Sequence, residues 1–253
     1  MLALKLALSP VLIGQAVSVR RRAPVLPEAA GERRGFMKPP ALDDVGTRPL
    51  RLLVVGDSSA AGVGVATQDQ ALAVPLARAL AAAIGRPVAW QLVARSGVTT
   101  QGALALLHEH APAGVGPADV AVAVLGVNDV VAQVPVPRAL AQRAELADWL
   151  AAHAGVRHVV FAPLPPMHRF PLLPQPLRWV LGRDAQRHDQ ALARWVAGRR
   201  DCSHLAINYT LGPESMADDG FHPGEPVYRA CAEALARHVA HHIPAPTPEE
   251  TTP

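Results

Sequence analysis

Four short polar clusters along the chain carry residue types that together could perform acyl transfer. In chain order they are Gly56-Asp57-Ser58, Ser96-Gly97, Gly126-Val127-Asn128-Asp129 and Asp219-Gly220-Phe221-His222. A serine hydroxyl is a weak nucleophile at neutral pH, so it needs a base within hydrogen-bond reach, and the base needs a third group that holds its tautomer. Ser58, His222 and Asp219 can fill these three roles.

Acyl transfer also builds negative charge on the carbonyl oxygen, which preorganised hydrogen-bond donors must meet. The candidate donors are the backbone N–H groups of Ser58 and Gly97 and the side-chain amide of Asn128. Gly97 has no Cβ, so a substrate oxygen can approach its backbone closely. The Asn128 amide is an uncharged donor. The predicted chemistry is attack by Ser58 on an acyl group.

The clusters must be positioned by the elements that precede them. From about residue 50, short apolar or β-branched runs alternate with Ala- and Leu-rich amphipathic stretches, which indicates βαβ units around a parallel sheet. We expect strands at 51–56, 88–94, 120–126, 158–163 and 203–208. Ligands bind at the carboxyl ends of such strands. The first three clusters follow the first three strands, so we expect them to converge on one edge.

Helices are expected between these strands and after the last one, at about 67–85, 137–155, 184–198 and 225–242. Thr67 and Gln70 form a capping box at the start of the first of these helices, and Gly85 lies where it should stop. Pro75 could kink this helix.

The four clusters resemble, in the same order, the sequence blocks of the SGNH (GDSL-like) hydrolase superfamily, and the whole is similar to its bacterial esterases from about residue 51 to 242. The resemblance implies a flavodoxin-like three-layer α/β/α sandwich with a central parallel sheet of about five strands. It also implies Ser58 as nucleophile, His222 as base, Asp219 as the acid that orients it, and Ser58, Gly97 and Asn128 as the oxyanion hole. The first block continues Ser-Ala-Ala-Gly where the family more often has Leu, which could alter the wall of the acyl site.

Each cluster taken alone has an ordinary explanation as a turn or a helix cap. Their conjunction, in fixed order at predicted strand ends, favours catalysis. Ser59 is a competing nucleophile, although it would begin the following helix. Asp218 competes with Asp219, and only the three-residue spacing to His222 in the resembling family separates them.

Other possible ligand sites are weaker. His108 and His110 are two residues apart and therefore do not share a helix face, so an exposed helix end is the simpler interpretation. The Gly62-x-Gly64 stretch lacks the rest of a dinucleotide or phosphate-binding motif. We expect no cofactor and no metal ion.

The charge balance does not indicate a nucleic-acid partner. The 253 residues carry 24 Lys and Arg against 21 Asp and Glu, a formal net charge of +3. Residues 1–50 hold eight of the basic and four of the acidic residues, so the rest of the chain has a net charge of −1. The basic character therefore belongs to the N-terminal segment.

Residues 1–49 are expected to be an apolar and basic segment followed by a linker or extended wrapping stretch, with the hydrolase domain at 50–243 and a disordered tail at 244–253. Arg20–Arg22 follow the apolar run, whereas a secretory signal has its charges before it, so no cleavable signal peptide is predicted. The segment is either an extra helix packed on the domain, or it makes peripheral contact with an anionic membrane through residues 2–22. We expect a cytoplasmic protein.

The proline-rich stretch 163–181 is either a wall or flap of the acyl pocket, or it simply covers the sheet. For the whole chain we expect hydrolysis of a small-molecule or lipid carboxylic ester with a short acyl chain, through an acyl-Ser58 intermediate. Two alternatives remain. The same site could serve an acyltransferase or a carbohydrate deacetylase, or the fold could be a catalytically silent binding module.

Overall fold

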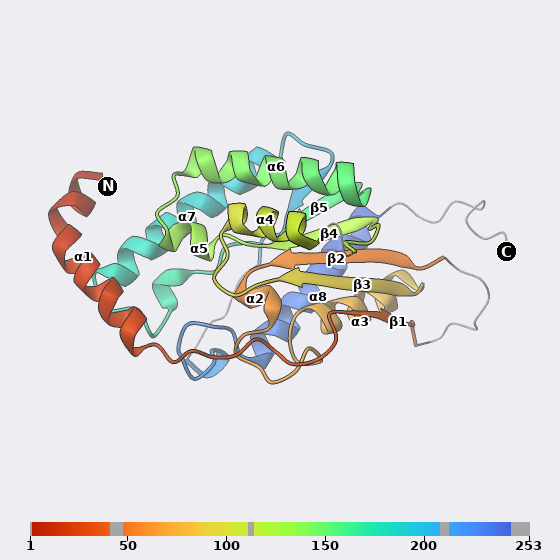
Figure 1. The fold of residues 1–253 in the computed structure, drawn as a ribbon, viewed down its shortest axis with the longest axis horizontal. Helices are drawn as coiled ribbons and strands as arrows, with labels where there is room; N and C mark the ends of the chain where they lie inside the picture. The colour runs from red at the N-terminus through yellow and green to blue at the C-terminus, as the bar shows by residue number, and fades with distance from the viewer. Residues whose placement is uncertain (1, 41–47, 111–113, 208–212, 244–253) are drawn as a thin grey trace.

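The structure, a computed structural model, describes residues 2–40, 48–110, 114–207 and 213–243 of the chain. Its centre is a six-stranded sheet in the order β1-β3-β2-β4-β5-β6 (Figure 1). The strands are β1 (Arg34–Met37), β2 (Leu50–Gly56), β3 (Val88–Ala94), β4 (Val120–Val124), β5 (His158–Phe161) and β6 (Cys202–His204). The expected tail at 244–253 and residue 208 of the last expected strand lie outside the described residues.

Five of the strands, β2 to β6, are parallel, and β1 pairs antiparallel with β3 at one edge. Numbered among themselves along the chain, the five parallel strands have the order 2-1-3-4-5, which is the order of flavodoxin-like folds. The predicted fold class is therefore confirmed, with one strand more than expected.

Helices cover both faces of this sheet. The longer ones are α1 (Leu2–Arg22), α3 (Ala73–Ile84), α4 (Thr100–His110), α6 (Val136–Ala154), α7 (Leu177–Val196) and α8 (Glu225–His242), and the short ones are α2 (Ser58–Ala61), α5 (Val127–Val131) and two 3-10 turns at Met167–Arg169 and Pro213–Ser215. In β2, Leu53 and Val55 face a core shared with α4, α6 and α7, whereas Leu52 and Val54 face a core shared with α3 and α8. A strand buried on both faces has a continuous apolar run, which made β2 visible in the sequence.

The helix expected at 67–85 is present as α3, but it begins later than expected, at Ala73. The side chain of Gln70 accepts a hydrogen bond from the Thr67 N–H at 3.3 Å, but both residues form a turn that precedes α3. Pro75 lies in the first turn of α3, where its missing N–H breaks no helical bond. Gly85 ends α3 with a φ of 63°.

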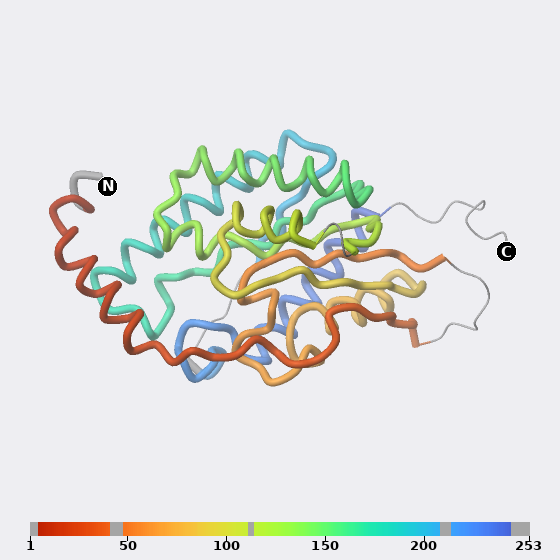
Figure 2. Tube along the Cα trace, viewed as in Figure 1, coloured from red at the N-terminus to blue at the C-terminus, as the bar shows by residue number. Residues whose placement is uncertain are grey.

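Residues 23–40 are part of the folded structure rather than a free linker. Ala29 and Ala30 donate their N–H groups to the carbonyls of Ala61 and Ala66 at 3.2 and 2.9 Å, and Arg34–Met37 forms the edge strand β1. Figure 2 shows this segment as a continuous tube that runs from α1 past α2 to β1. The sheet thus extends beyond the expected boundary at residue 50. The burial pattern of β1, mostly exposed, carries no strand signal.

Helix α1 lies beyond the carboxyl ends of the parallel strands (Figure 1). Lys5 forms an ion pair with Asp184 of α7. The side-chain amide of Gln15 forms two hydrogen bonds at the start of α7. Its Nε2 donates to the Gln175 carbonyl at 2.6 Å, and its Oε1 accepts from the Leu177 N–H at 3.1 Å. The segment is thus an extra helix packed on the domain. None of the helices in the described ranges is both long enough and apolar enough to cross a bilayer.

The stretch 163–181 is mostly buried. Met167, Phe170 and Leu173 belong to the core on the α4, α6 and α7 side of the sheet, whereas Trp179 is 40% exposed. From Leu177 onward the stretch is already helical, seven residues before the expected helix start at 184. The stretch therefore covers the core, and Pro163 and Phe170 also line a cavity beside Ser58.

Candidate active site

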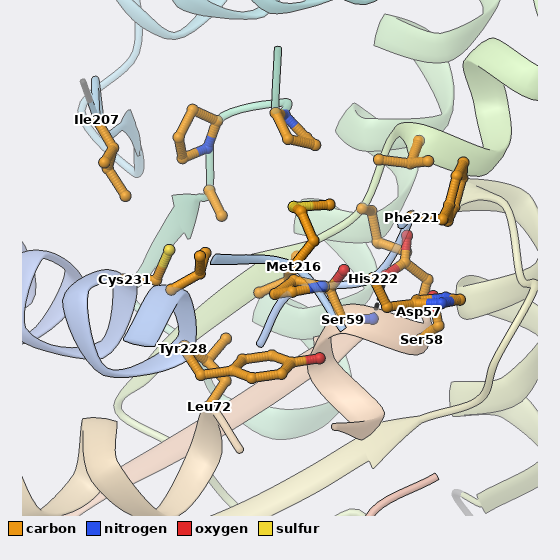
Figure 3. A pocket seen from close by; sticks show the side chains of 18 of the residues that line it. Asp57, Ser58, Ser59, Leu72, Ile207, Met216, Phe221, His222, Tyr228 and Cys231 are labelled. Carbon is orange, nitrogen blue, oxygen red and sulfur yellow. Dashed lines mark hydrogen bonds between the residues drawn. The ribbon is translucent and has the colours of Figure 1, made fainter. Parts of the chain in front are cut away.

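Ser58, His222 and Asp219 meet at the carboxyl edge of the sheet. Ser58 begins α2 directly after β2, and the other two residues lie in the loop before α8. The Nε2 atom of His222 is 3.0 Å from the Ser58 Oγ (Figure 3), and the Nδ1 atom is 2.5 Å from the Asp219 Oδ2. This is the order of contacts that a serine nucleophile, its base and an orienting acid require.

The turn after β2 holds Ser58 in place. Asp57 caps α2 by accepting the Ser59 N–H at 3.0 Å, and the Val63 N–H donates to the Ser58 carbonyl at 3.0 Å. Ser58 is only 8% exposed. Of the two candidate nucleophiles, it is Ser58 whose hydroxyl contacts the histidine, while Ser59 contributes its N–H to the cap.

Asp219 is held by its own loop. Its Oδ1 accepts the N–H groups of Phe221 and His222, each at 2.9 Å. Burial works to raise the pKa of Asp219, but the hydrogen bond from the His222 ring and those from the two backbone N–H groups outweigh it and lower the pKa. The carboxylate therefore stays ionised at neutral pH. Asp218, the competing acid, is exposed.

The loop that carries His222 packs closely against the loop that follows α2. The Ala217 N–H donates to the His222 carbonyl at 2.9 Å, which closes the loop on itself. Gly64 has a φ of 105°, and a Cβ at this position would lie 2.4 Å from the Pro223 carbonyl oxygen. Only a glycine permits so close an approach. The Gly62-x-Gly64 stretch thus supports the histidine loop.

Two of the proposed oxyanion donors, Gly97 and Asn128, lie just after the carboxyl ends of β3 and β4. Gly97, in the loop after β3, has a φ of 81°, and nothing lies within 4 Å of where its Cβ would be. Asn128 is in the first turn of α5. Its Nδ2 donates to the Val98 carbonyl at 3.0 Å and, more weakly, to the Asp57 Oδ2 at 3.3 Å. These contacts orient the amide and leave open space over Gly97.

The Asp57 carboxyl is buried beside the nucleophile. Burial raises the pKa of Asp57 to about 7, the hydrogen bond from the Ser59 N–H works in the opposite direction, and the charge of Asp129 raises it further. Because the same carboxyl contacts the Asn128 amide, the charge next to the oxyanion donor changes near neutral pH.

A buried network behind Asn128 was not predicted from the sequence. Asp129 accepts the N–H and the hydroxyl of Thr100 at 2.9 and 2.6 Å, and it forms an ion pair with Arg143 of α6 at 3.3 Å. Both charged side chains are almost completely buried. The network connects α4, α5 and α6, and it fixes the turn that carries Asn128.

One sequence signal could have revealed this network. Arg143 falls on the apolar face of α6, four residues after Ala139 and three before Leu146. Arginine is almost never fully buried unless it is paired. An arginine on an apolar helix face therefore predicts a buried acid, and Asp129 is that acid.

The other candidate sites remain ordinary. His108 and His110 are exposed at the end of α4. Within the ranges that the structure describes, no three His, Cys, Asp or Glu residues are grouped so that they could hold a metal ion. Neither Cys202 nor Cys231 forms a disulfide bond within the described residues.

Two cavities meet at the His222 loop. The first, here named the inner pocket, has a volume of about 80 Å³ and lies beside Ser58 (Figure 3). Its walls are mainly apolar and include Leu72, Pro163, Phe170, Met216, Val227 and Tyr228. The second, here named the α1–α7 groove, has a volume of about 710 Å³ and is walled by residues such as Leu12, Ile13, Ala16, Leu172, Leu177 and Val180. Phe221 and His222 line both cavities.

A flavodoxin-like sheet with Ser, His and Asp in contact at its carboxyl edge is the arrangement of the SGNH class of serine hydrolases. The family model of the GDSL-like lipase/acylhydrolase family matches residues 54–230. The chain therefore belongs to this family, and it is a carboxylic ester hydrolase. The resemblance seen in the sequence is confirmed.

Individual relatives agree with this assignment. The chain is 28% identical over 245 residues to the GDSL-like esterase Rv1075c of Mycobacterium tuberculosis (strain ATCC 25618 / H37Rv), with 89% of this chain and 74% of that protein covered. Two solved structures share the fold. The lipase Lip_vut3 from a goat rumen metagenome has a TM-score of 0.60 at 17% identity, over 76% of this chain and 98% of that one. A putative arylesterase from Agrobacterium tumefaciens str. C58 has a TM-score of 0.59 at 20% identity, over 77% and 100%.

Proposed function

We propose that the chain hydrolyses carboxylic esters of short acyl groups through a covalent acyl-Ser58 intermediate. The observation that carries the proposal is the pair of contacts at His222, 3.0 Å to the Ser58 Oγ and 2.5 Å to Asp219. The base thereby faces the nucleophile with one nitrogen and the ionised acid with the other. Asp219 stabilises the imidazolium that forms during the reaction.

In the first half-reaction, the Ser58 oxygen bonds to the carbonyl carbon as its proton passes to Nε2 of His222. The electron pair of the C=O bond moves onto oxygen, where the N–H groups of Ser58 and Gly97 and the Asn128 amide stabilise it. The bond to the alcohol oxygen then breaks, and that oxygen takes the proton from Nε2. A water molecule, deprotonated by His222, releases the acid and restores Ser58.

To stabilise the oxyanion, the Asn128 amide must exchange one of its present hydrogen bonds for a hydrogen bond to the substrate. Its 3.3 Å contact with Asp57 is weaker than its 3.0 Å contact with the Val98 carbonyl. We expect the developing oxyanion to replace the contact with Asp57, while the contact with Val98 keeps the amide in place.

The inner pocket supports a short acyl group. It is the cavity that Ser58 itself lines, and it holds about 80 Å³ between Phe170, Met216 and Tyr228. This volume is about a ninth of the 710 Å³ of the α1–α7 groove. An acyl chain bonded to Ser58 and extending into this pocket is therefore short.

The first experiment is labelling with a fluorophosphonate, followed by mass spectrometry of the modified peptide and turnover of a p-nitrophenyl ester series. We expect an adduct on Ser58 and faster turnover of acetate and butyrate than of octanoate. Ser59→Ala is the matched control and should label normally, whereas Ser58→Ala should not label. A folded protein with no adduct and no turnover would favour the silent binding module.

The rival activities use the same catalytic groups with another acceptor or substrate. An acyltransferase would form a new ester when an alcohol is added, and product analysis detects it. A carbohydrate deacetylase would release acetate from sugar acetates faster than from alkyl acetates. The apolar walls of both cavities favour an apolar ester over a sugar.

We also propose that α1 contacts an anionic membrane surface on the cytoplasmic side. Leu6, Ile13 and Val17 are 64%, 64% and 44% exposed, and their spacing places them along one side of the helix. Three arginines, Arg20–Arg22, follow in its last turn. Exposed apolar residues beside a basic cluster are typical of peripheral membrane binding.

Vesicle co-sedimentation tests this contact. Binding should require phosphatidylserine in phosphatidylcholine vesicles and should weaken when salt is raised. The variant Leu6→Ser should bind less, because Leu6 is 64% exposed on α1, while a Val25→Ser variant is the matched control, because Val25 is 98% exposed but lies outside α1. Equal binding to neutral and anionic vesicles would contradict the proposal.

A further inference from the structure

The α1–α7 groove takes no part in the steps described above, although it ends at the catalytic histidine. Asp219, Phe221 and His222 line it, together with residues of α1 and α7, and its volume is about 710 Å³. Ser58 does not line the groove; it lines the inner pocket. The two cavities thus have Phe221 and His222 as common lining residues.

The order of proton transfers assigns the two arms of an ester to these two cavities. The acyl carbon is bonded to Ser58, so the acyl chain starts in the inner pocket. The leaving oxygen must receive a proton from Nε2 of His222, so it lies within hydrogen-bond reach of that nitrogen. The chain attached to this oxygen therefore extends past His222, toward the groove.

The walls of the groove indicate what kind of chain it accepts. The lining includes Leu12, Ile13 and Ala16 of α1 and Leu177 and Val180 of α7. Its volume of about 710 Å³ is roughly nine times that of the inner pocket, so it has room for a longer chain than the inner pocket has. A hydrocarbon chain would leave no polar group unpaired there, whereas a sugar would.

Lys5, one of the charged residues that line the groove, already has partners. The ammonium of Lys5 is paired with Asp184 and donates to the Gln133 Oε1 at 2.8 Å. These contacts, with those of Gln15 to the start of α7, hold α1 in place as one wall. The wall lies outside the region matched by the family model, which begins at residue 54.

We propose that the α1–α7 groove binds the hydrocarbon chain of the alcohol part of the ester. The substrates are then short-chain acyl esters of long apolar alcohols, and α1 determines the choice of alcohol. The inference rests on the proposed function, because it uses the roles of Ser58 and His222.

A pair of isomeric esters tests the proposal directly. Octyl acetate and ethyl octanoate have the same molecular formula, but the long hydrocarbon chain belongs to the alcohol part of the first and to the acyl part of the second. Each methylene that leaves water completely contributes about fourfold in binding. We expect kcat/KM for octyl acetate to exceed that for ethyl octanoate and for ethyl acetate by at least about tenfold, with each ester below its solubility limit and no lipid present.

A variant that narrows the groove separates its contribution from that of the catalytic groups. Ala16→Phe places a ring in the groove from an exposed position of α1, so folding should be preserved. It should raise KM for octyl acetate by roughly fivefold or more and leave ethyl acetate unchanged. Val11→Phe is the matched control on the same helix, because Val11 is 48% exposed and does not line the groove.

Three results would overturn the proposal. Faster hydrolysis of ethyl octanoate, with Ala16→Phe affecting that ester, would assign the groove to the acyl arm. Equal rates for the isomers, with Ala16→Phe without effect, would show that the groove binds no substrate. In both cases turnover of p-nitrophenyl acetate shows that the proposed function itself stands. No turnover of any ester, together with an unlabelled Ser58, would remove the proposed function and the inference with it.

Discussion

The inner pocket and the α1–α7 groove share a wall but are built from different parts of the chain. The inner pocket is formed mainly by strand-end loops and α8, most of its lining residues lie inside the family region, and it is small. The volume of the groove is roughly nine times larger. One of its walls is α1, which lies outside the region matched by the family model. We therefore expect that substitutions on α1 can change the choice of alcohol without changing the chemistry at Ser58, because the proposed catalytic residues do not lie on α1.

The strongest test of this separation is Ser58→Ala. Turnover of p-nitrophenyl acetate should fall on the order of a millionfold, because the nucleophile is lost. Binding of octyl acetate, measured by titration calorimetry, should stay within about twofold of the unaltered protein, because the groove is untouched. If binding were lost together with turnover, the two cavities would not be separate in function.

Asn128→Ala should have the next largest effect. The loss of one oxyanion donor costs roughly a hundred- to a thousandfold in kcat. The factor should be the same for ethyl acetate and octyl acetate, since the donor acts on the carbonyl oxygen that both share. A circular dichroism melt serves as the folding control. A factor that grew with alcohol length would place Asn128 in the groove's function instead.

Asp57→Asn should change how stability depends on pH. The folded pKa of Asp57 is raised from 3.8 to about 7, so between these values the folded state binds a proton that the unfolded state has lost. The contribution of this group is therefore fully present below pH 4 and is lost as the pH rises through 7.

Denaturant unfolding at pH 5 and pH 8 measures this effect. The unaltered protein should lose on the order of 2 kcal/mol more between these pH values than the Asp57→Asn variant does. Octyl acetate binding at the groove should be equal in both proteins. An identical fall in stability in the variant would show that Asp57 does not carry the pH dependence.

Lys5→Met should produce the smallest effect and should be confined to the groove. Lys5 and Asp184 form a partly exposed pair at the contact between α1 and α7, and such pairs contribute up to about 1 kcal/mol. Amide exchange in α1 should become faster, and kcat/KM for octyl acetate should fall about twofold, with p-nitrophenyl acetate unchanged. Slower turnover of both esters would show that α1 also supports the catalytic residues.

The parts that could be predicted from sequence are those in which local pattern and position in the sheet coincide. Ser58, Gly97 and Asn128 each follow an apolar run of strand length, so their convergence followed from the rule for parallel sheets. His222 and Asp219 are three residues apart, and their loop needs only local hydrogen bonds. These features depend on short-range information.

The parts that could not be predicted depend on contacts between distant segments. Strand β1 is mostly exposed and gains its structure from main-chain pairing with β3, in which the partners Gly35 and Trp90 are 55 positions apart in the sequence. The α1 sequence indicated a helix, but its place over the carboxyl edge depends on Lys5 and Gln15 finding partners on or next to α7. No periodicity encodes such pairings.

The distance along the chain between Ser58 and His222, 164 residues, also sets the time at which activity can arise during synthesis. A ribosome-bound chain that already displays the nucleophile still lacks its base, which lies just before the final helix. Tyr228 in that helix must reach the Val63 carbonyl, at 2.7 Å, for the loop to settle beside Ser58. If Ser58 and His222 have the proposed roles, we expect nascent chains to be inert toward esters until α8 has left the exit tunnel and docked.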